Sequence, residues 1–271
     1  MTRFVHRSLA AGLLVLSLFT GSASARDFLF TEAESDCFAQ MIFMNECSGR
    51  EEKLLYWSPD EAFPSLGIGH FIWYPENASG SYLETFPAFL GFAKEIHLMI
   101  PPWIVALPNK HCPWQSREEF LRDLPSDRVR ELRAFLSNTK SEQAQFIGRR
   151  FMRVFPRILD DLNESDREAT QQKYDLLMRR REATFAMIDY VNFKGEGLRA
   201  DARYDGMGWG LAHVLIEMNI PDDPEKALDE FILAAERVLE RRVSRSPRPE
   251  IEAKWLPGWK NRVRSYSRIK C

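Results

Sequence analysis

A glutamate at the end of an apolar helix face has the character of a catalytic acid. Ala39, Ile42 and Phe43 recur at helical spacing, and Glu46 falls on the same apolar stripe. Desolvation disfavours the charged form of a carboxyl, so a position beside apolar residues would raise the pKa of Glu46, as a general acid requires. Ser48 and a glycine follow at once and predict the end of the helix. We therefore expect Glu46 at the lip of a site and not inside a closed core.

A second set of candidate catalytic residues follows further along the chain. If residues 61–65 form a strand, Glu61 and Ser65 point to one face and Asp60 to the other, although Pro64 disturbs the alternation. Glu61 and Ser65 would then share one surface. Strand alternation thus favours Glu61 as a second carboxylate, with Asp60 as the alternative.

Two glycines and a histidine follow the serine. Gly67 and Gly69 leave the backbone bare, which suits a strand that lies against a bulky ligand, and His70 comes next. A carboxylic acid, a second carboxylate and a hydroxyl are the groups that glycoside hydrolysis needs. One carboxyl protonates the leaving oxygen, while the other, with the hydroxyl, positions water or stabilises positive charge on the sugar ring. Because carboxyl groups suffice for this reaction, we expect no cofactor.

An inward glutamate followed by the segment Gly67-Ile68-Gly69-His70 resembles the phage-type lysozymes of the lysozyme-like superfamily. The resemblance covers about residues 31–74. It implies that Glu46 is the catalytic acid and that Ser65 stands where the family usually has threonine. The family's spacing places the second carboxylate at Asp60 or at the preceding position, which is proline here. Asp60 and Glu61 therefore both remain candidates.

The longer spacing after the glutamate, and serine in place of threonine, are also similar to the chitosanases of the same superfamily. The resemblance implies a mainly α, α+β lysozyme-like fold, with two helical lobes and a small β-hairpin near residues 61–74. It further implies an exported glycoside hydrolase that cleaves a bacterial cell-wall polysaccharide or a related amino-sugar polymer. The expected partner is thus a polysaccharide, peptidoglycan before chitin or chitosan.

Aromatic and polar residues near these motifs are candidates for sugar binding. Trp73 and Tyr74 follow the Gly-Ile-Gly-His segment, and flat aromatic faces suit stacking on pyranose rings. A second patch, residues 189–197, leaves a helix through a glycine-rich exit whose polar side chains suit hydrogen bonds to N-acetyl or hydroxyl groups. The candidates there are Asn192, Lys194 and Glu196. The alternative for this patch is a helix C-terminus with its charges in solvent.

Capping boxes, in which a hydroxyl residue precedes a glutamate by three positions, predict several helix starts. They begin at Thr31, Ser116, Thr139 and Ser165. The segment from Asp166 to Val191 lacks proline and glycine and has helical periodicity, so we expect one long central helix. Pro224 and Pro247 bracket a further amphipathic helix. Its inward positions are Leu228, Ile232, Ala235 and Leu239.

The four cysteines allow at most two disulfides, with three connectivities open. If the chain termini lie close together, Cys37 pairs with Cys271, which leaves Cys47 with Cys112. A thiol-protease pair of Cys47 and His70 is disfavoured because exported chains use cysteines in disulfides. The histidines are not paired at helical spacing and no Cys-x-x-Cys motif occurs, so we predict no metal site.

The start of the chain has the pattern of a secretory signal peptide. Basic residues precede an apolar run from Leu9 to Phe19 that is too short to cross a bilayer comfortably, and small residues lead to Ala25. We expect cleavage after Ala25 and a periplasmic or secreted protein. No later segment is apolar enough to cross a membrane.

Residues 26–271 are expected to form one lysozyme-like domain, with a site-bearing lobe at 26–114 and a helical lobe at 115–271. A composition of 45% hydrophobic residues excludes a disordered chain, and a net charge of −2 gives no sign of nucleic-acid binding. The charge is uneven: the first lobe is acidic, whereas the stretch from Arg237 to Lys270 is basic. That stretch predicts either a basic surface or a solvated helix face. The oligomeric state is not indicated.

The main alternative to an enzyme is an envelope protein that keeps a lysozyme-like fold and only binds glycan or a protein partner. A fold does not establish an activity, and the second carboxylate is not fixed by the motif. The sequence therefore supports two hypotheses, a glycosidase that uses Glu46 as its acid and a non-catalytic binding protein.

Overall fold

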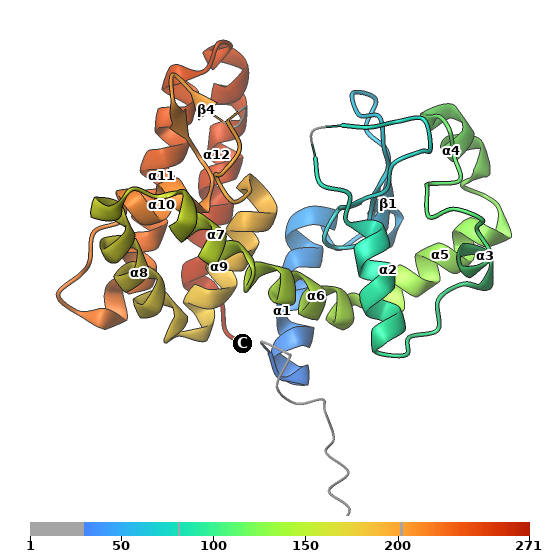
Figure 1. Ribbon diagram of the computed structural model, residues 1–271, viewed down its shortest axis with the longest axis horizontal. Helices are drawn as coiled ribbons and strands as arrows, with labels where there is room; N and C mark the ends of the chain where they lie inside the picture. Colours follow the sequence, from blue (N-terminus) through green and yellow to red (C-terminus); the bar gives the residue numbers. More distant parts are fainter. Residues whose placement is uncertain (1–29, 81, 201–202) are drawn as a thin grey trace, which may run out of the picture.

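The described part of the chain folds mainly into α-helices, as the sequence predicts, and also contains two small antiparallel sheets. The computed structural model describes residues 30–80, 82–200 and 203–271. The proposed signal peptide lies outside these residues. Figure 1 shows two lobes side by side, with helices α1 (Glu32–Cys47) and α6 (Lys140–Phe151) between them. Across the described ranges, no helix is both long and apolar enough to cross a membrane.

Helix α1 begins and ends where local signals predict. Thr31 accepts a hydrogen bond from the backbone of Glu34, and the Glu34 carboxylate accepts one in return from the backbone of Thr31. At the other end, Ser48 adopts a left-handed conformation with φ 54° and closes the helix. These two caps place Glu46 in the last turn of α1, which packs along α6.

The sheet lobe follows α1 in the chain. Its elements are η1 (Glu51–Leu54), β1 (Leu55–Tyr56), β2 (Ser65–Leu66), β3 (Phe71–Ile72), α2 (Phe86–Glu95), α3 (Pro102–Val105), α4 (Arg117–Asp123) and α5 (Asp127–Asn138). The three strands are antiparallel in the order β1-β2-β3, with Leu66 opposite both Leu55 and Phe71. The expected hairpin is therefore a three-stranded sheet, and residues 61–64 lie outside its strands.

The helical lobe contains most of the second half of the chain. Its elements are α7 (Val154–Asp161), α8 (Glu164–Met178), α9 (Arg181–Lys194), β4 (Arg203–Tyr204), β5 (Met207–Gly208), α10 (Leu211–Glu217), η2 (Pro224–Lys226), α11 (Ala227–Arg245), α12 (Pro249–Ser265) and η3 (Tyr266–Arg268). Helices α4 and α5 belong to the sheet lobe, since α5 packs on η1. The two lobes thus meet at α6 and not near residue 114.

Two helix predictions are wrong. The long helix expected from Asp166 to Val191 is two helices, α8 and α9, because Arg180 between them is extended and its guanidinium donates to the carbonyl and carboxylate of Glu225. Helix α8 begins one residue before Ser165, with Asn163 as its cap. By contrast, the helix bracketed by prolines is α11, and its four predicted inward residues are buried.

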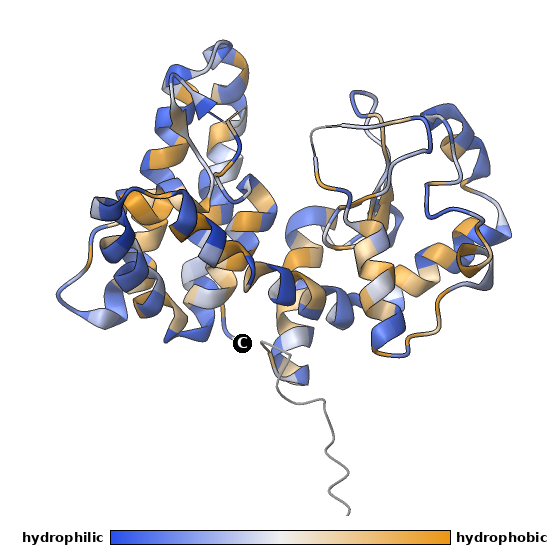
Figure 2. Cartoon of the chain, in the orientation of Figure 1, coloured by the Kyte–Doolittle hydropathy of each residue, from blue (hydrophilic) through white to orange (hydrophobic). Residues whose placement is uncertain are grey.

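The hydrophobic core is continuous through both lobes. Phe38 of α1 stacks on Phe185 of α9, with ring centroids 4.9 Å apart, and Phe71 of β3 packs on Phe89 of α2 and Phe146 of α6. Figure 2 shows apolar residues concentrated on α2 and α10, whereas α8 is mostly hydrophilic. Burial of aromatic rings between α1, α6 and both lobes fixes the lobes against the central helices.

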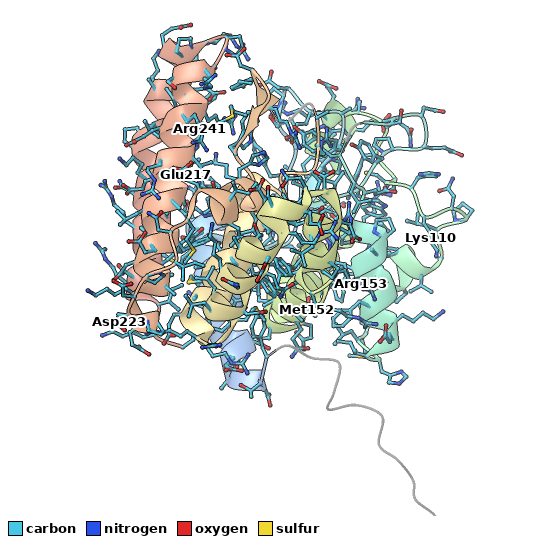
Figure 3. All side chains as sticks on the ribbon, turned by 60° about the vertical axis from the view of Figure 1, so that its left-hand side comes forward. Lys110, Met152, Arg153, Glu217, Asp223 and Arg241 are labelled. Atoms are coloured by element: carbon cyan, nitrogen blue, oxygen red, sulfur yellow. A yellow bond between two sulfur atoms is a disulfide. The ribbon has the colours of Figure 1, made fainter. Side chains whose placement is uncertain are left out.

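Many basic residues in the stretch from Arg237 to Lys270 are neutralised by carboxylates. Glu217 of α10 accepts hydrogen bonds from Arg237 and Arg241 of α11 (Figure 3). The Lys260 ammonium forms ion pairs with Glu236 and Glu240. The basic stretch is therefore in large part a set of helix-to-helix ion pairs. This arrangement differs from an open basic surface.

The cysteines form one of the two expected disulfides. Cys37 of α1 and Cys271 are bonded, with Cα atoms 5.6 Å apart, which ties the end of the chain to the central helix. Cys47 and Cys112 are free and buried, so their expected pairing is wrong. Burial raises the pKa of the Cys47 thiol to about 11 and that of Cys112 to about 12. Both thiols are therefore protonated and unreactive near neutral pH.

We predict that replacing Cys37 and Cys271 by serine lowers the free energy of unfolding by about 2–5 kcal/mol, because the bond closes a loop that spans most of the chain. Guanidinium unfolding of the wild type and the double variant measures the difference. Addition of reductant should lower the stability of the wild type and leave the double variant unchanged.

A thiol titration provides the control for this pairing. In denaturant without reductant, the wild type should show two reactive thiols, those of Cys47 and Cys112. A count of zero would mean that Cys47 and Cys112 are also paired, and a count of four would mean that Cys37 and Cys271 are not.

Candidate functional site

Glu46 lies where α1 meets both lobes and receives partners from three distant segments. Its side chain is 12% exposed. Oε1 accepts hydrogen bonds from Asn192 Nδ2 at 3.1 Å and from Arg262 Nη2 at 2.6 Å. Oε2 lies 3.6 Å from Nδ1 of His70. The structure thus brings together three residues that were predicted separately from the sequence: Glu46, His70 and Asn192.

Arg262 connects Glu46 to a fully buried aspartate. Its Nε donates to Asp189 Oδ2 at 2.9 Å and its Nη2 to Asp189 Oδ1 at 2.8 Å. The hydroxyl of Tyr266 donates to Asp189 Oδ2 at 2.6 Å. Burial opposes the charge of Arg262, but the carboxylates of Asp189 and Glu46 outweigh it and hold the pKa of Arg262 above its ordinary value. The Arg262 guanidinium therefore pairs with the carboxylates of both Asp189 and Glu46.

Arg262 was not predicted from the sequence, and Asp189 begins the predicted patch 189–197 without an assigned role. A signal for Asp189 was present, because this residue follows the largely apolar stretch 183–188 on α9, and an aspartate on a buried helix face requires a partner. Nothing in the local sequence identifies that partner, because Arg262 lies 73 residues further along the chain. Only the fold brings α12 to α9.

His70 occupies the turn between β2 and β3 with φ 46°. Its side chain is 36% exposed. Burial by the surrounding protein lowers its pKa, the charge of Glu46 opposes this, and Arg262 and Lys53 lower the pKa further. The imidazole is therefore mainly neutral at neutral pH, and its contact with Glu46 is not an ion pair there.

The two oxygens of Glu46 have different surroundings. Oε1 is held by Arg262 and Asn192. Within the described part of the chain, Oε2 faces only His70, at a distance beyond a hydrogen bond. Oε2 is therefore the oxygen of Glu46 that is available to contact a bound molecule.

The other proposed catalytic residues belong to the sheet lobe, at and before the start of β2. Asp60 and Glu61 are exposed in the connection between β1 and β2, and Ser65 is buried in β2. Partial burial, and then the charge of Asp60, raise the pKa of Glu61. Residues 61–64 do not form a strand, so the predicted sharing of one face by Glu61 and Ser65 is wrong. No hydrogen bond or ion pair joins these three residues to Glu46 in the described ranges.

The interpretation of the two glycines as room for a ligand is wrong. Gly67 has φ 69°, and a Cβ there would lie 2.2 Å from Oε1 of Gln143. That oxygen accepts a hydrogen bond from the backbone of Ile68 at 2.9 Å. A Cβ on Gly69 would lie 2.4 Å from the ring of Phe71. The protein's own side chains fill the space that these glycines leave.

Trp73 and Tyr74 are not available for sugar stacking. Trp73 is fully buried, and its Nε1 donates to the carbonyl of Lys110 at 2.7 Å. Tyr74 is buried against Phe63, and its hydroxyl donates to the carbonyl of Tyr82 at 3.3 Å. Their position after the motif reflects packing between the sheet and the loops of this lobe.

The three predicted residues of the patch at the end of α9 make different contacts. Asn192 binds Glu46, as described above, whereas Glu196 pairs with Arg157 of α7 at 3.1 Å. Lys194 Nζ lies over the rings of Phe193 and Trp259, at 4.0 Å and 3.5 Å from their centroids. Gly195 and Gly197, both with positive φ, end the helix as predicted. The patch therefore lies partly at the site and partly between helices.

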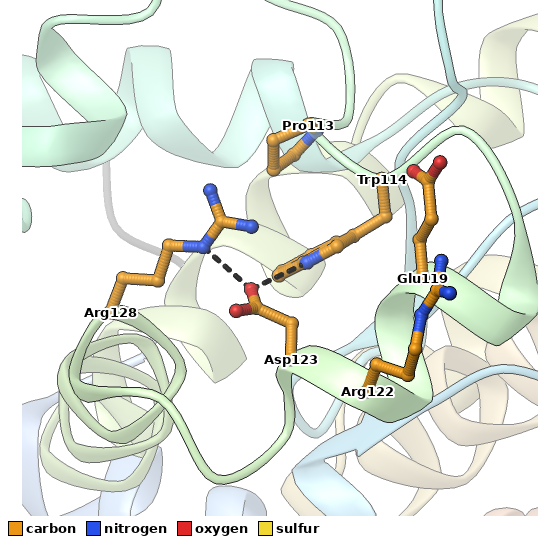
Figure 4. Close-up of a pocket in the computed structure, with 6 residues that line it drawn as sticks. All are labelled: Pro113, Trp114, Glu119, Arg122, Asp123 and Arg128. Carbon is orange, nitrogen blue, oxygen red and sulfur yellow. Dashed lines mark hydrogen bonds and ion pairs between the residues drawn. The ribbon is translucent and has the colours of Figure 1, made fainter.

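A separate hollow of about 290 Å³ lies in the sheet lobe, at Trp114, Asp123 and Arg128 (Figure 4). Asp123 accepts hydrogen bonds from Trp114 Nε1 at 2.7 Å and Arg128 Nε at 2.5 Å. None of the predicted site residues lines it. For the residues that the structure describes, no group of three or more His, Cys, Asp or Glu side chains is arranged to hold a metal ion.

Comparison of the chain with protein-family models, curated proteins and solved structures finds no match. The resemblance to lysozyme-like enzymes therefore stays a prediction from residues 31–74, and the site's function is argued from its own geometry.

We predict that Arg262→Ala lowers the free energy of unfolding by about 3–5 kcal/mol, because it leaves the buried Asp189 carboxylate without its cation. Chemical denaturation at neutral pH measures the loss. Arg264→Ala is a matched control on the same helix, since its ion pair with Glu236 involves a half-exposed guanidinium and should contribute about 1 kcal/mol or less. Equal losses in the two variants would contradict a special role for Arg262.

Proposed function

We propose that this protein is an exported glycoside hydrolase in which Glu46 is the general acid. The observation that carries the proposal is the Glu46 carboxyl itself, which is nearly buried at the junction of the lobes, is fixed through Oε1 and has Oε2 free of hydrogen bonds to described residues. A catalytic acid must be oriented and must also keep one oxygen available to the leaving group.

Arg262 can hold Glu46 in place because it is itself held by a buried partner. Asp189 is fully buried and takes two hydrogen bonds from Arg262. The buried charge of Asp189 must be compensated, which keeps the guanidinium at this position. Oε1 of Glu46 is therefore fixed by Arg262 while Oε2 lies towards His70.

Glu61 and Asp60 remain the candidates for the second carboxylate. Glu61 is anchored through its backbone carbonyl, which accepts a hydrogen bond from Trp57 Nε1 at 2.8 Å. Among the residues that the structure describes, its carboxyl has no hydrogen-bond or ion-pair partner, and partial burial, with the charge of Asp60, raises its pKa. In the proposed reaction this second group positions water or stabilises positive charge on the sugar, with Ser65 as the accompanying hydroxyl.

The proposed substrate is an amino-sugar polysaccharide, peptidoglycan before chitin or chitosan, and the proposed location is the periplasm or the exterior of the cell. The bonded pair Cys37 and Cys271 supports export, because disulfides persist in oxidising compartments. Cleavage of a signal peptide after Ala25 belongs to the same proposal. The proposed chemistry uses carboxyl groups of the chain and requires no cofactor.

A non-catalytic glycan-binding protein is the second candidate. It is favoured by the ion pair between Arg262 Nη2 and Glu46 Oε1 at 2.6 Å, which engages one oxygen of the proposed acid. It is also favoured by the absence of any described contact between Glu46 and the Asp60 and Glu61 pair. Such a protein would bind polysaccharide and would not cleave it.

We predict that the protein without residues 1–25 releases reducing ends from peptidoglycan, and that Glu46→Gln lowers the rate by about 10²–10⁴-fold through loss of the proton donor. Glutamine keeps an oxygen for Arg262 and Asn192, so the variant should fold and bind glycan as the wild type does. Glu32→Gln is the control, because it removes an exposed carboxyl from the first turn of the same helix.

The outcomes separate the two candidates. Activity that persists in Glu46→Gln would show that the acid is misassigned. Absence of cleavage of peptidoglycan, chitin and chitosan by the wild type, with binding intact, would establish the binding protein instead. Within an active enzyme, substitutions at Asp60, Glu61 and Ser65 identify the second carboxylate by their loss of turnover.

A further inference from the structure

A column of alternating cations and aromatic rings extends from Glu46 into the helical lobe. It is built from α9, α11, α12 and the loop after β5. Cations lie over ring faces at distances between 3.5 Å and 4.8 Å from the ring centroids. In order from Glu46, its members are Arg262, Phe193, Lys194, Trp259, Arg242 and Trp209.

The cations at the two outer positions of the column have carboxylate partners. Arg262 binds Asp189 and Glu46. Arg242 binds the buried Glu252 through two hydrogen bonds of 3.0 Å and 3.2 Å. For Lys194, between them, no carboxylate of the described residues lies at ion-pair distance from the ammonium, which contacts the rings of Phe193 and Trp259.

The charges around Lys194 leave its ammonium uncompensated. Burial, and then the like charges of Arg242 and Arg262, lower its pKa to about 6, while Glu252 and Glu46 act in the opposite direction. These four charged groups come from α1, α11 and α12. An anion placed on Lys194 would supply the missing negative charge and favour the protonated amine.

We propose that Lys194 binds a carboxylate of the substrate, so that the site takes a carboxylated amino-sugar polysaccharide in preference to a neutral or cationic one. This inference rests on the proposed function and narrows its substrate class. A polymer with lactyl or peptide carboxylates meets the requirement. Neutral chitin and cationic chitosan lack the negative charge that would pair with the Lys194 ammonium.

The surface next to Lys194 suits a sugar chain. Trp255 of α12 is 50% exposed, and its ring lies 6.0 Å from that of Trp259. A pyranose ring stacked on an exposed indole beside Lys194 would bring its acidic substituent close to the ammonium. This aromatic surface on α12 replaces the stacking that Trp73 and Tyr74 cannot provide.

The test compares glycans that differ only in charge. The probes are soluble, uncrosslinked peptidoglycan strands, the same strands with their carboxyls converted to amides, and a neutral hexamer of N-acetylglucosamine. Binding is measured by calorimetry on the chain without residues 1–25, with Glu46→Gln as background so that cleavage does not consume the probe. The added variants are Lys194→Gln, Lys194→Arg and, as a matched control on α12, the exposed Lys254→Gln.

At pH 6, we expect Lys194→Gln to weaken binding of the carboxylated strands about tenfold, which corresponds to about 1.4 kcal/mol. Binding of the amidated strands and of the hexamer should not change. At this pH Lys194→Arg should keep the affinity, and Lys254→Gln should leave all three probes unaffected. Equal loss for charged and amidated strands in Lys194→Gln, or no loss for either, would overturn the inference.

The pH dependence of the affinity is a second test, in which the charge of Lys194 is removed by titration and not by mutation. Because the free amine loses its proton above about pH 6, affinity for carboxylated strands should fall as the pH rises from 6 to 8. In Lys194→Arg, whose guanidinium stays charged, the affinity should be flat over this range. Identical pH profiles in the two proteins would contradict the role of Lys194.

Failure of this inference can be told apart from failure of the proposed function. If cleavage depends on Glu46 but Lys194 gives no preference for carboxylated strands, the protein is a hydrolase and the inference about Lys194 is wrong. If binding depends on Lys194 but no polysaccharide is cleaved, the anion site exists and the proposed hydrolase activity is wrong.

Discussion

One guanidinium connects three helices that are far apart in the chain. Arg262 of α12 binds Asp189 of α9 and Glu46 of α1. Because Asp189 is fully buried, its charge must be compensated, and this requirement positions α12 against α9. The bond between Cys37 and Cys271 ties the chain just beyond α12 to α1. The interaction that stabilises the contact of these helices is therefore also the one that orients the candidate acid, so fold and site depend on the same charge.

Local signals account for much of the fold. The capping box at Thr31, the left-handed Ser48 and the prolines around α11 act within a few residues, and each appears in the structure as the sequence predicts. The break between α8 and α9 could not be predicted in this way. Arg180 lacks any helix-breaking character, and its extended conformation accompanies bonds to Glu225, a residue that the fold brings from 45 positions away. Long-range partners of this kind leave no local pattern.

The same distinction explains the site. Glu46 was predictable because an acid on an apolar helix stripe is unusual, and its partners His70 and Asn192 stood in patches with unusual polar composition. The glycines and aromatic residues of the motif were misinterpreted, because residue type does not say which atoms fill the space beside it. For Gly67 that space holds Gln143, a residue of α6. A position can require glycine whether the space beside it holds a ligand or a buried side chain.

Two charge imbalances of opposite sign lie along the column that starts at Glu46. At Glu46 one guanidinium faces two carboxylates, whereas at Lys194 a cation lacks a partner. On the functions proposed for these groups, a carboxylated glycan on Lys194 adds a negative charge on the same side of the site as Glu46. A carboxylate held by Lys194 and a Glu46 oriented by Arg262 would then belong to one continuous set of charges built on α1, α9 and α12. Recognition of the substrate and the group proposed to cleave it would thus depend on the same contacts between helices.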